Sequence, residues 1–108
     1  MNNSINIIPE ELTSIAPFVI VDVRQVEEVI KQPLLGEYKH IKMDELLSSF
    51  DLIDSEKNIV FVCAAGIRSK YVAEIYRSNG FVNTYSLSVG VAELNEFYMS
   101  NNNLYNSK

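Results

Sequence analysis

The sequence predicts an α/β fold with a mainly parallel central sheet of about five strands, flanked by helices on both faces. Two continuous apolar runs, at residues 18–21 and 59–62, consist of β-branched and aromatic residues and are too short for buried helices. Such runs are typical of strands that are covered on both faces, as in a parallel sheet. Helical patterns alternate with these runs along the chain, which indicates a layered arrangement of strands and helices.

Three helices are expected in the first half of the chain. Pro9 suits a first helical turn, where its missing N–H is not needed, and the acidic Glu10 and Glu11 follow at the positive end of the helix dipole. Residues 25–31 form a second short helix that stops before a proline. Residues 44–50 carry three apolar side chains at helical spacing and form the third.

The second half of the chain contains the clearest helix, at residues 68–79. An apolar stripe runs along it, and Gly80 supplies its C-terminal stop. A short strand at residues 81–87 and a last helix at residues 89–99 follow. Gly66 lies in the connection between the strand 59–62 and the helix 68–79, and ligands of open α/β sheets bind in such connections.

Length and composition indicate one domain, residues 1–108, with a polar tail at about residues 100–108. A chain of 108 residues, 47% apolar, is long enough to bury a core. No apolar run reaches the roughly 20 residues of a membrane-spanning helix, and the N-terminus lacks the layout of a signal peptide. The net charge is −5, which argues against a nucleic-acid partner. We therefore expect a small soluble cytoplasmic domain without membrane or nucleic-acid partners.

Cys63 is the only cysteine, so a disulfide within the chain and a multi-cysteine zinc site are excluded. It closes the strand 59–62, and a helix begins about five residues later. The small residues Ala64, Ala65 and Gly66 allow backbone N–H groups to point inward, so that the loop and the helix N-terminus form an anion-binding nest. Such surroundings lower a cysteine pKa from about 8.5 to roughly 3.5–7.5. We predict a reactive cysteine rather than a packing residue, with no metal or cofactor.

Arg68, at the far end of the loop, adds a positive charge near the sulfur or an incoming anion. Residues 57–80 contain four basic side chains, Lys57, Arg68, Lys70 and Arg77, against the single acidic Glu74. This local excess in an acidic chain suits a small anionic substrate. Lys70 and Arg77 could equally be the solvated face of a helix, and for Arg77 this is the favoured interpretation.

Two chemistries use a cysteine in such a loop: attack on phosphorus in phosphate-ester hydrolysis, and transfer of a sulfane sulfur. Only four residues separate Cys63 from Arg68, which makes a small cradle, and the loop contains no aspartate that could serve as general acid. A small cradle suits one extra sulfur better than a whole phosphate tetrahedron, although an aspartate could also come from elsewhere in the chain. A cysteine phosphatase or arsenate reductase is the less favoured enzyme.

Residues 63–69 resemble the active-site loop of the rhodanese-like family of single-domain sulfurtransferases. The stretches 21–24, followed by two glutamates, and 80–91 are similar to other signatures of this family, and the resemblance covers about residues 8–97. It implies that Cys63 carries sulfur as a persulfide and that Asp22 and Arg24 give structural support. It also implies that the loop binds the sulfur or its donor through Ala64, Ala65, Gly66, Ile67, Arg68 and Ser69.

The resemblance implies a sulfurtransferase that takes sulfur from thiosulfate or a protein persulfide and passes it to cyanide or a thiol, such as that of a sulfur-carrier or sulfur-relay protein. The chain has no resolving cysteine, so another molecule must discharge the persulfide. A non-catalytic binding or regulatory module is the alternative. The segment 34–38 departs from the family pattern, Leu94 replaces a tryptophan, and the only histidine, His40, is expected to be a surface or partly packed residue rather than a catalyst.

Overall fold

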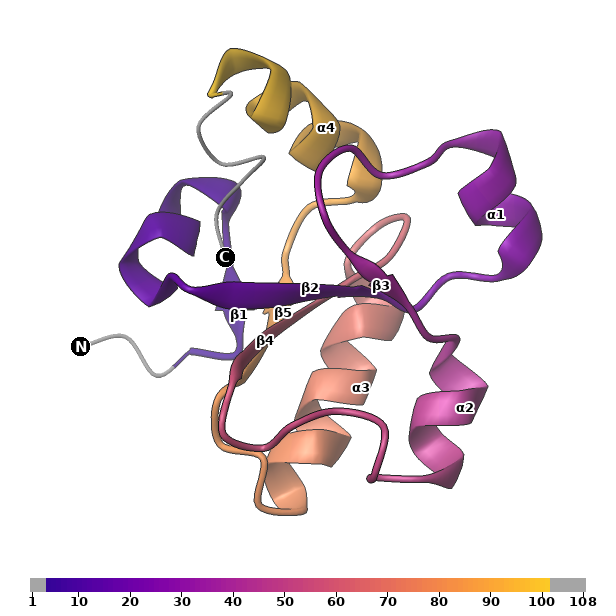
Figure 1. Cartoon of the computed structure of the whole chain (residues 1–108), viewed down its shortest axis with the longest axis vertical. Coiled ribbons are helices and arrows are strands. Elements are labelled where there is room, and N and C mark those ends of the chain that lie inside the picture. Colours follow the sequence, from indigo (N-terminus) through magenta and orange to yellow (C-terminus); the bar gives the residue numbers. More distant parts are fainter. Residues whose placement is uncertain (1–3, 102–108) are drawn as a thin grey trace.

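The computed structural model describes residues 4–101, which form a five-stranded sheet with helices on both faces (Figure 1). The elements follow one another as β1 (Asn6–Ile7), the 3₁₀ helix η1 (Pro9–Ile15), β2 (Phe18–Asp22), α1 (Val26–Lys31), β3 (Lys39–His40), α2 (Met43–Ser48), β4 (Asn58–Val62), α3 (Ile67–Ser78), β5 (Thr84–Leu87) and α4 (Val91–Ser100). The strand order is β1-β5-β4-β2-β3, and all neighbours pair in parallel. The predicted fold class is confirmed.

The two apolar runs are the central pair of strands. β2 and β4 pair over five positions, from Phe18 opposite Asn58 to Asp22 opposite Val62. Nearly every side chain of this pair is buried, because helices cover both faces of the sheet. β5 begins at Thr84, three residues later than the run 81–87 predicts, because residues 79–83 first reverse the chain after α3.

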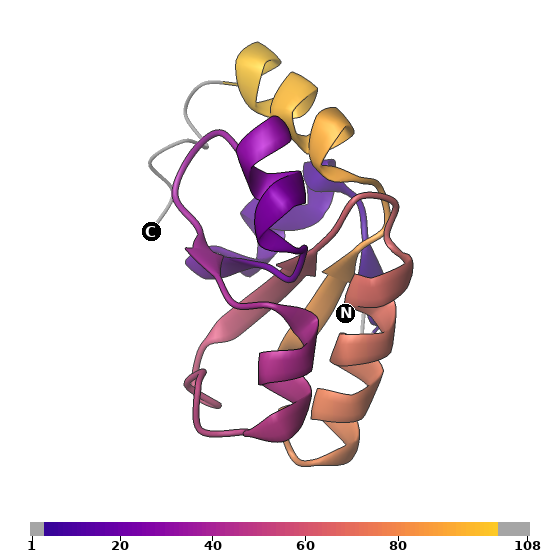
Figure 2. The same cartoon turned by 90° about the vertical axis from the view of Figure 1, so that its right-hand side faces the viewer.

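Each face of the sheet has its own apolar cluster. On one face η1 and α4 supply Leu12, Leu94 and Tyr98 to a cluster with β2, β4 and β5. On the other face α2 and α3 supply Leu46, Val72, Ala73 and Tyr76. Figure 2 shows the same two layers from the side, with α2 and α3 below the sheet and α4 above it.

Four helices use the same device at their N-termini, a glutamate at the third helical position. The side chains of Glu11, Glu28, Glu45 and Glu93 each accept a hydrogen bond from the N–H of the residue that precedes the helix, over 2.9–3.1 Å. Each carboxylate thus satisfies a backbone donor and lies at the positive end of its helix. The acidic first turns that the sequence contains are therefore structural.

Two elements differ from the sequence prediction in kind. β1 and β3 are two-residue strands at the edges of the sheet, and no run of apolar residues marks either of them. Ser100, expected in a polar tail, is the last residue of α4. Asn101 follows as the C-terminal cap of this helix, and residues 102–108 of the predicted tail lie outside the described residues.

No helix within residues 4–101 is long and apolar enough to cross a membrane.

Tyr76 joins α3 to α2 through a buried hydroxyl. This hydroxyl donates to the carbonyl oxygens of Leu46 (2.7 Å) and Ser49 (3.1 Å), and burial raises its pKa to about 12. We expect Tyr76→Phe to lower the free energy of unfolding by about 1–2 kcal/mol, because it leaves buried acceptors without a donor. Tyr71→Phe, on the exposed face of the same helix, is the control and should change it by less than about 0.5 kcal/mol. Urea denaturation measures both, and equal effects would contradict the assignment.

Candidate active site

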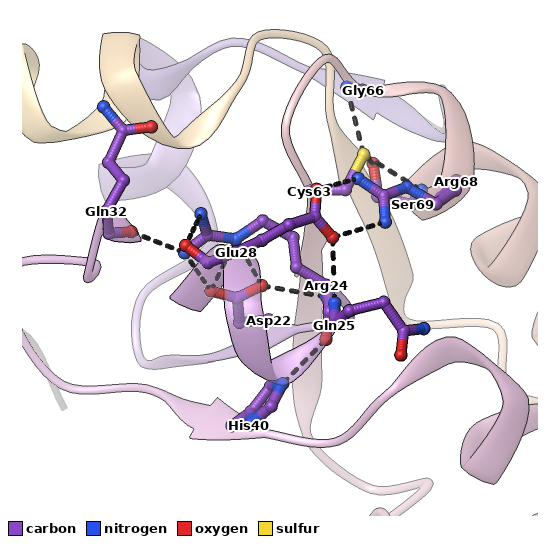
Figure 3. A network of polar contacts seen from close by, with 10 residues as sticks. All are labelled: Asp22, Arg24, Gln25, Glu28, Gln32, His40, Cys63, Gly66, Arg68 and Ser69. Carbon is purple, nitrogen blue, oxygen red and sulfur yellow. Dashed lines mark hydrogen bonds and ion pairs between the residues drawn. The ribbon is translucent and has the colours of Figure 1, made fainter. Parts of the chain in front are cut away.

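Cys63 lies directly after β4, at the end of the sheet that is formed by the C-termini of the parallel strands. The N–H of Val23 donates to the carbonyl of Val62 (3.0 Å), which extends the β2–β4 pairing to this end. Cys63 and the end of β2, with Asp22 and Arg24, therefore lie side by side, as Figure 3 shows. Only 1% of Cys63 is exposed.

The loop after Cys63 curls so that its amides surround the sulfur. The N–H groups of Gly66 (3.1 Å) and Ser69 (3.4 Å) donate to Sγ (Figure 3). Gly66 has φ +84°, a left-handed conformation that favours glycine, and it immediately precedes the first turn of α3. The predicted nest of backbone donors is thus present in the structure.

Burial and hydrogen bonding act in opposite directions on the pKa of the Cys63 thiol. Burial raises the pKa of the Cys63 thiol, because it removes water from the thiolate. Hydrogen bonds from the hydroxyl and amide of Ser69 and from the amides of Ala65 and Gly66 lower it by more. The pKa of Cys63 therefore lies below the ordinary value, which is the direction that a nucleophilic or sulfur-carrying cysteine needs.

Arg68 does not bond to the sulfur. Its guanidinium makes a two-pronged ion pair with Glu28 of α1, in which Nη1 and Nη2 each lie 2.8 Å from a carboxylate oxygen. The pair lowers the pKa of Glu28 to about 2 and raises that of Arg68. Both terminal nitrogens of Arg68 are thus bonded to Glu28, while its charge still interacts with the Cys63 sulfur through space.

Two of the four basic side chains of residues 57–80 are thus engaged in contacts of their own. Besides Arg68, Arg77 is used elsewhere: its Nε donates to the carbonyl of Thr84 (2.8 Å), and its guanidinium lies over the ring of Tyr85. Arg77 was expected on a solvated helix face, and this expectation was wrong, because the side chain folds back to link α3 with β5.

Asp22 and Arg24 form a buried ion pair beside the loop. Arg24 Nη2 lies 2.8 Å from Asp22 Oδ2, and the guanidinium also donates to the backbone carbonyls of Glu28 (3.2 Å) and Gln32 (2.9 Å). These bonds fasten α1, at Glu28 and at the capping residue Gln32, to the end of β2, a geometry that suits the structural role expected for this pair. His40 Nε2 lies 2.7 Å from the Arg24 carbonyl oxygen, and because a carbonyl only accepts, Nε2 must carry the proton. His40 thus lies outside the sulfur's immediate surroundings.

The remaining loop residues differ in what they contribute. The side chains of Ala64, Ala65 and Ile67 are exposed, with Ile67 76% exposed at the start of α3. Ser69 is fully buried, and its hydroxyl lies 3.4 Å from the sulfur. The loop therefore holds the sulfur with its backbone and with Ser69.

The N-terminus of helix α4 packs against the backbone of Cys63 and Ala64. The N–H of Val91 donates to the Cys63 carbonyl (3.1 Å), and a side chain at Gly90 would overlap the carbonyl oxygen of Ala64. Glycine at position 90 is thus needed for the close approach of the two backbones. Leu94, where the family pattern has a tryptophan, is completely buried below this contact.

Two residues at the site, Glu28 and Ser86, are not among the site residues that the sequence predicts. Glu28 was noted only as part of a family signature, although its place in the first turn of a predicted helix is a signal for an N-terminal cap. Ser86 of β5 is fully buried and lies 2.8 Å from the Ser69 hydroxyl. A small polar residue between Tyr85 and Leu87 in a predicted strand was the signal available for it.

Within residues 4–101, a surface hollow lies away from the Cys63 loop, and the side chains form no metal-binding cluster. A hollow of about 420 Å³ between η1 and α4 is lined by Phe97, Glu93 and their neighbours, and not by the loop. No group of three or more His, Cys, Asp or Glu side chains within this range is placed to hold a metal ion.

The chain belongs to the family of rhodanese-like domains, whose model matches residues 9–96. It is 41% identical over 68 residues to the tRNA sulfurtransferase of Mannheimia succiniciproducens, covering 60% of this chain and 14% of that protein. It is 29% identical over 72 residues to YtwF of Bacillus subtilis, which carries the name of a sulfurtransferase, covering 67% of this chain and 69% of that protein. The chain thus spans about a seventh of the length of the first relative.

A solved structure shares the fold over nearly the whole chain. The rhodanese-related protein of Thermoplasma volcanium superposes with a TM-score of 0.72 at 25% identity, and the match covers 89% of this chain and 93% of that one. The expected family and fold are therefore confirmed.

The Glu28–Arg68 pair yields a prediction for pH dependence. A carboxyl whose folded pKa is about 2 rather than 4.5 contributes stability above pH 4.5, and this contribution is lost as the pH falls toward 2. Because both side chains are about one-third exposed, we expect less than about 1 kcal/mol. In Arg68→Gln the Glu28 carboxyl should titrate near its ordinary range, as NMR would show. The NMR signal of Glu27, the exposed neighbour of Glu28, is the control and should not respond to Arg68→Gln. A Glu28 titration that is unchanged in this variant would contradict the pairing.

A second prediction concerns the contact between Gly90 and the loop. We expect Gly90→Ala to push Ala64 outward, to destabilise the chain by about 1–3 kcal/mol and to change the NMR signal of the Cys63 Cβ carbon. Gly80→Ala is the control, because nothing lies near its side-chain position and only its positive φ is strained. A Cys63 signal that changes equally in both variants would show that the contact is not specific.

Proposed function

We propose that the protein is a sulfurtransferase in which Cys63 carries a sulfane sulfur as a persulfide. The observation that carries the proposal is the buried sulfur held by the Gly66 and Ser69 amides and the Ser69 hydroxyl, at a lowered pKa. The names of the relatives in Mannheimia succiniciproducens and Bacillus subtilis support the same class of activity. The finer steps rest on the geometry of the loop.

In the first step the Cys63 thiolate attacks the outer sulfur of the donor. With thiosulfate as donor, a bond forms between Sγ and the outer sulfur, the sulfur–sulfur bond of thiosulfate breaks, and sulfite leaves with the bonding electron pair. With a persulfide as donor, the leaving group is the donor's thiolate. The transferred sulfur keeps one negative charge as the outer atom of the persulfide. This charge lies beside the N–H groups that already surround Sγ.

In the second step an acceptor thiolate, or cyanide, attacks the outer sulfur and Cys63 leaves as a thiolate. The lowered pKa helps here as well, because a thiolate of low pKa is a good leaving group. The chain has no second cysteine, so the acceptor must be another molecule, for example a sulfur-carrier or sulfur-relay protein with a reactive thiol.

The role proposed for Arg68 and the loop is to bind the donor. Arg68 lies at the loop's end with its two terminal nitrogens already on Glu28, so an anionic donor must share the guanidinium with that carboxylate. The remaining donors are the backbone amides of residues 64–69. This arrangement suits a donor that needs one or two hydrogen bonds, such as a persulfide or the outer end of thiosulfate, better than one that needs a full tetrahedral cradle for phosphate.

The experiment is sulfur loading followed by intact mass measurement. After incubation with thiosulfate, or with a small-molecule persulfide, we expect the mass to rise by one sulfur atom and to return on addition of cyanide. Cys63→Ser should show neither change, and Ser88→Ala, an exposed residue near the loop, is the control that should behave like the wild type. Equal uptake by Cys63→Ser would refute the assignment to this residue. A wild type that takes up no sulfur from either donor would favour a binding module.

A further inference from the structure

Beneath the Cys63 sulfur, two serine hydroxyls form a chain that leads into the protein interior. Cys63 Sγ lies 3.4 Å from Ser69 Oγ, which lies 2.8 Å from Ser86 Oγ, and Ser86 Oγ lies 3.4 Å from the carbonyl oxygen of Leu87. Ser69 and Ser86 are both completely buried. A buried hydroxyl costs free energy unless it is hydrogen-bonded, and of the two bonds of the Ser86 hydroxyl the one to Ser69 is the shorter.

Each serine hydroxyl has a single proton, so the chain has a direction. With Cys63 as a thiol, S–H donates to Ser69, Ser69 donates to Ser86, and Ser86 donates to the Leu87 carbonyl. A thiolate cannot donate. The Ser69 hydroxyl must then turn its own proton to the sulfur, and its oxygen becomes free to accept the proton of Ser86. The one proton lost to solvent is that of the thiol.

We propose that Ser86 is a positioning residue, which directs the Ser69 hydroxyl at the Cys63 sulfur whenever that sulfur carries negative charge. In this state the Ser86 hydroxyl donates to Ser69 over 2.8 Å, and Ser69 donates to the sulfur. Hydrogen bonds to an ionised group are about twice as strong as neutral ones, and a chain of hydroxyls polarises along its length. The inner bond therefore strengthens on ionisation, and Ser86 stabilises the thiolate without touching it.

The charged and titratable side chains of the neighbouring elements that the structure shows near Cys63 each have a partner other than Ser86. Arg68 of α3 pairs with Glu28 of α1, Arg24 pairs with Asp22 after β2, and Glu93 of α4 accepts from the Gly90 N–H. His40 of β3 donates to a backbone carbonyl. None of these groups bonds to Ser86, so a change confined to Ser86 tests the hydroxyl chain and leaves the charges in place.

The test measures the pKa of the Cys63 thiol by NMR. The Cβ carbon of cysteine is isotopically labelled, and its signal is recorded as the pH is changed. Because the chain has one cysteine, the label gives one signal to titrate. We expect Ser86→Ala to raise this pKa by about half a unit, which corresponds to the loss of part of one charge-assisted hydrogen bond. Thr84→Val is the control: Thr84 is buried in the same strand, but its hydroxyl donates to the Phe81 carbonyl.

A double-mutant cycle separates positioning from a general structural effect. If Ser86 acts through Ser69, Ser86→Ala should cause no further shift of the Cys63 pKa in a Ser69→Ala chain. The pair Ser86→Thr and Ser86→Val compares presence and absence of the hydroxyl at constant shape, in case the alanine variant does not fold. The proposal is overturned if the Ser86→Ala shift persists without Ser69, if Thr84→Val shifts the pKa equally, or if the threonine and valine variants titrate alike.

The consequence for turnover rests on the proposed function. The rate constant of sulfur uptake should rise with pH along the titration of the thiol, and Ser86→Ala should move the midpoint of this profile by the same amount as the pKa. A midpoint that stays in place while the pKa moves would overturn this part of the inference. If wild type takes up no sulfur at all, the proposed function fails, whereas the NMR titration still decides the role of Ser86.

Discussion

The pairing of β2 with β4 is the constraint on which the rest of the site depends. Its register sets Asp22 opposite Val62, so that the residues following both strands emerge at one edge of the sheet. One of these exits leads to the Asp22–Arg24 pair, which fastens α1, and the other leads to Cys63 and its loop. A register shifted by one residue would exchange the side chains that the two faces of the sheet present to the two apolar clusters, so the same packing that forms the core also fixes the separation of the two halves of the site.

Around this edge the molecule treats two kinds of charge differently. The positive charges are placed against carboxylates: Arg24 against Asp22 in the interior, and Arg68 against Glu28 nearer the solvent. The sulfur, in contrast, faces backbone N–H groups and a hydroxyl, none of which carries a full charge. Fixed dipoles need little reorganisation when charge appears or leaves, which suits the proposed cycle, in which the charge moves to a second sulfur and back.

The sequence predicts the central strands, α3 and the Cys63 loop because local signals define them: continuous apolar runs, a helical stripe ending at Gly80, and small residues after a strand. It does not mark β1 and β3, because a two-residue strand is defined by its neighbour in the sheet and has no periodicity of its own. The partners of Arg68 and Arg77 were missed for a related reason. Glu28 lies 40 residues from Arg68, and the Thr84 carbonyl belongs to a backbone whose position depends on the fold. Ser86 is of the same kind, because only the packing of β5 on α3 brings its hydroxyl to Ser69.

The burial of Cys63 has a consequence for how the chain can meet other thiols. A disulfide requires two Cβ atoms to lie about 3.8 Å apart, and a side chain that is 1% exposed does not admit a second folded protein that closely. Two copies are thus sterically kept from linking through their single cysteines while the loop stays closed. An added sulfur would lengthen the side chain by about 2 Å, one sulfur–sulfur bond. In the proposed cycle, loading would therefore change reach as well as reactivity, because the transferred sulfur would lie one sulfur–sulfur bond beyond Sγ.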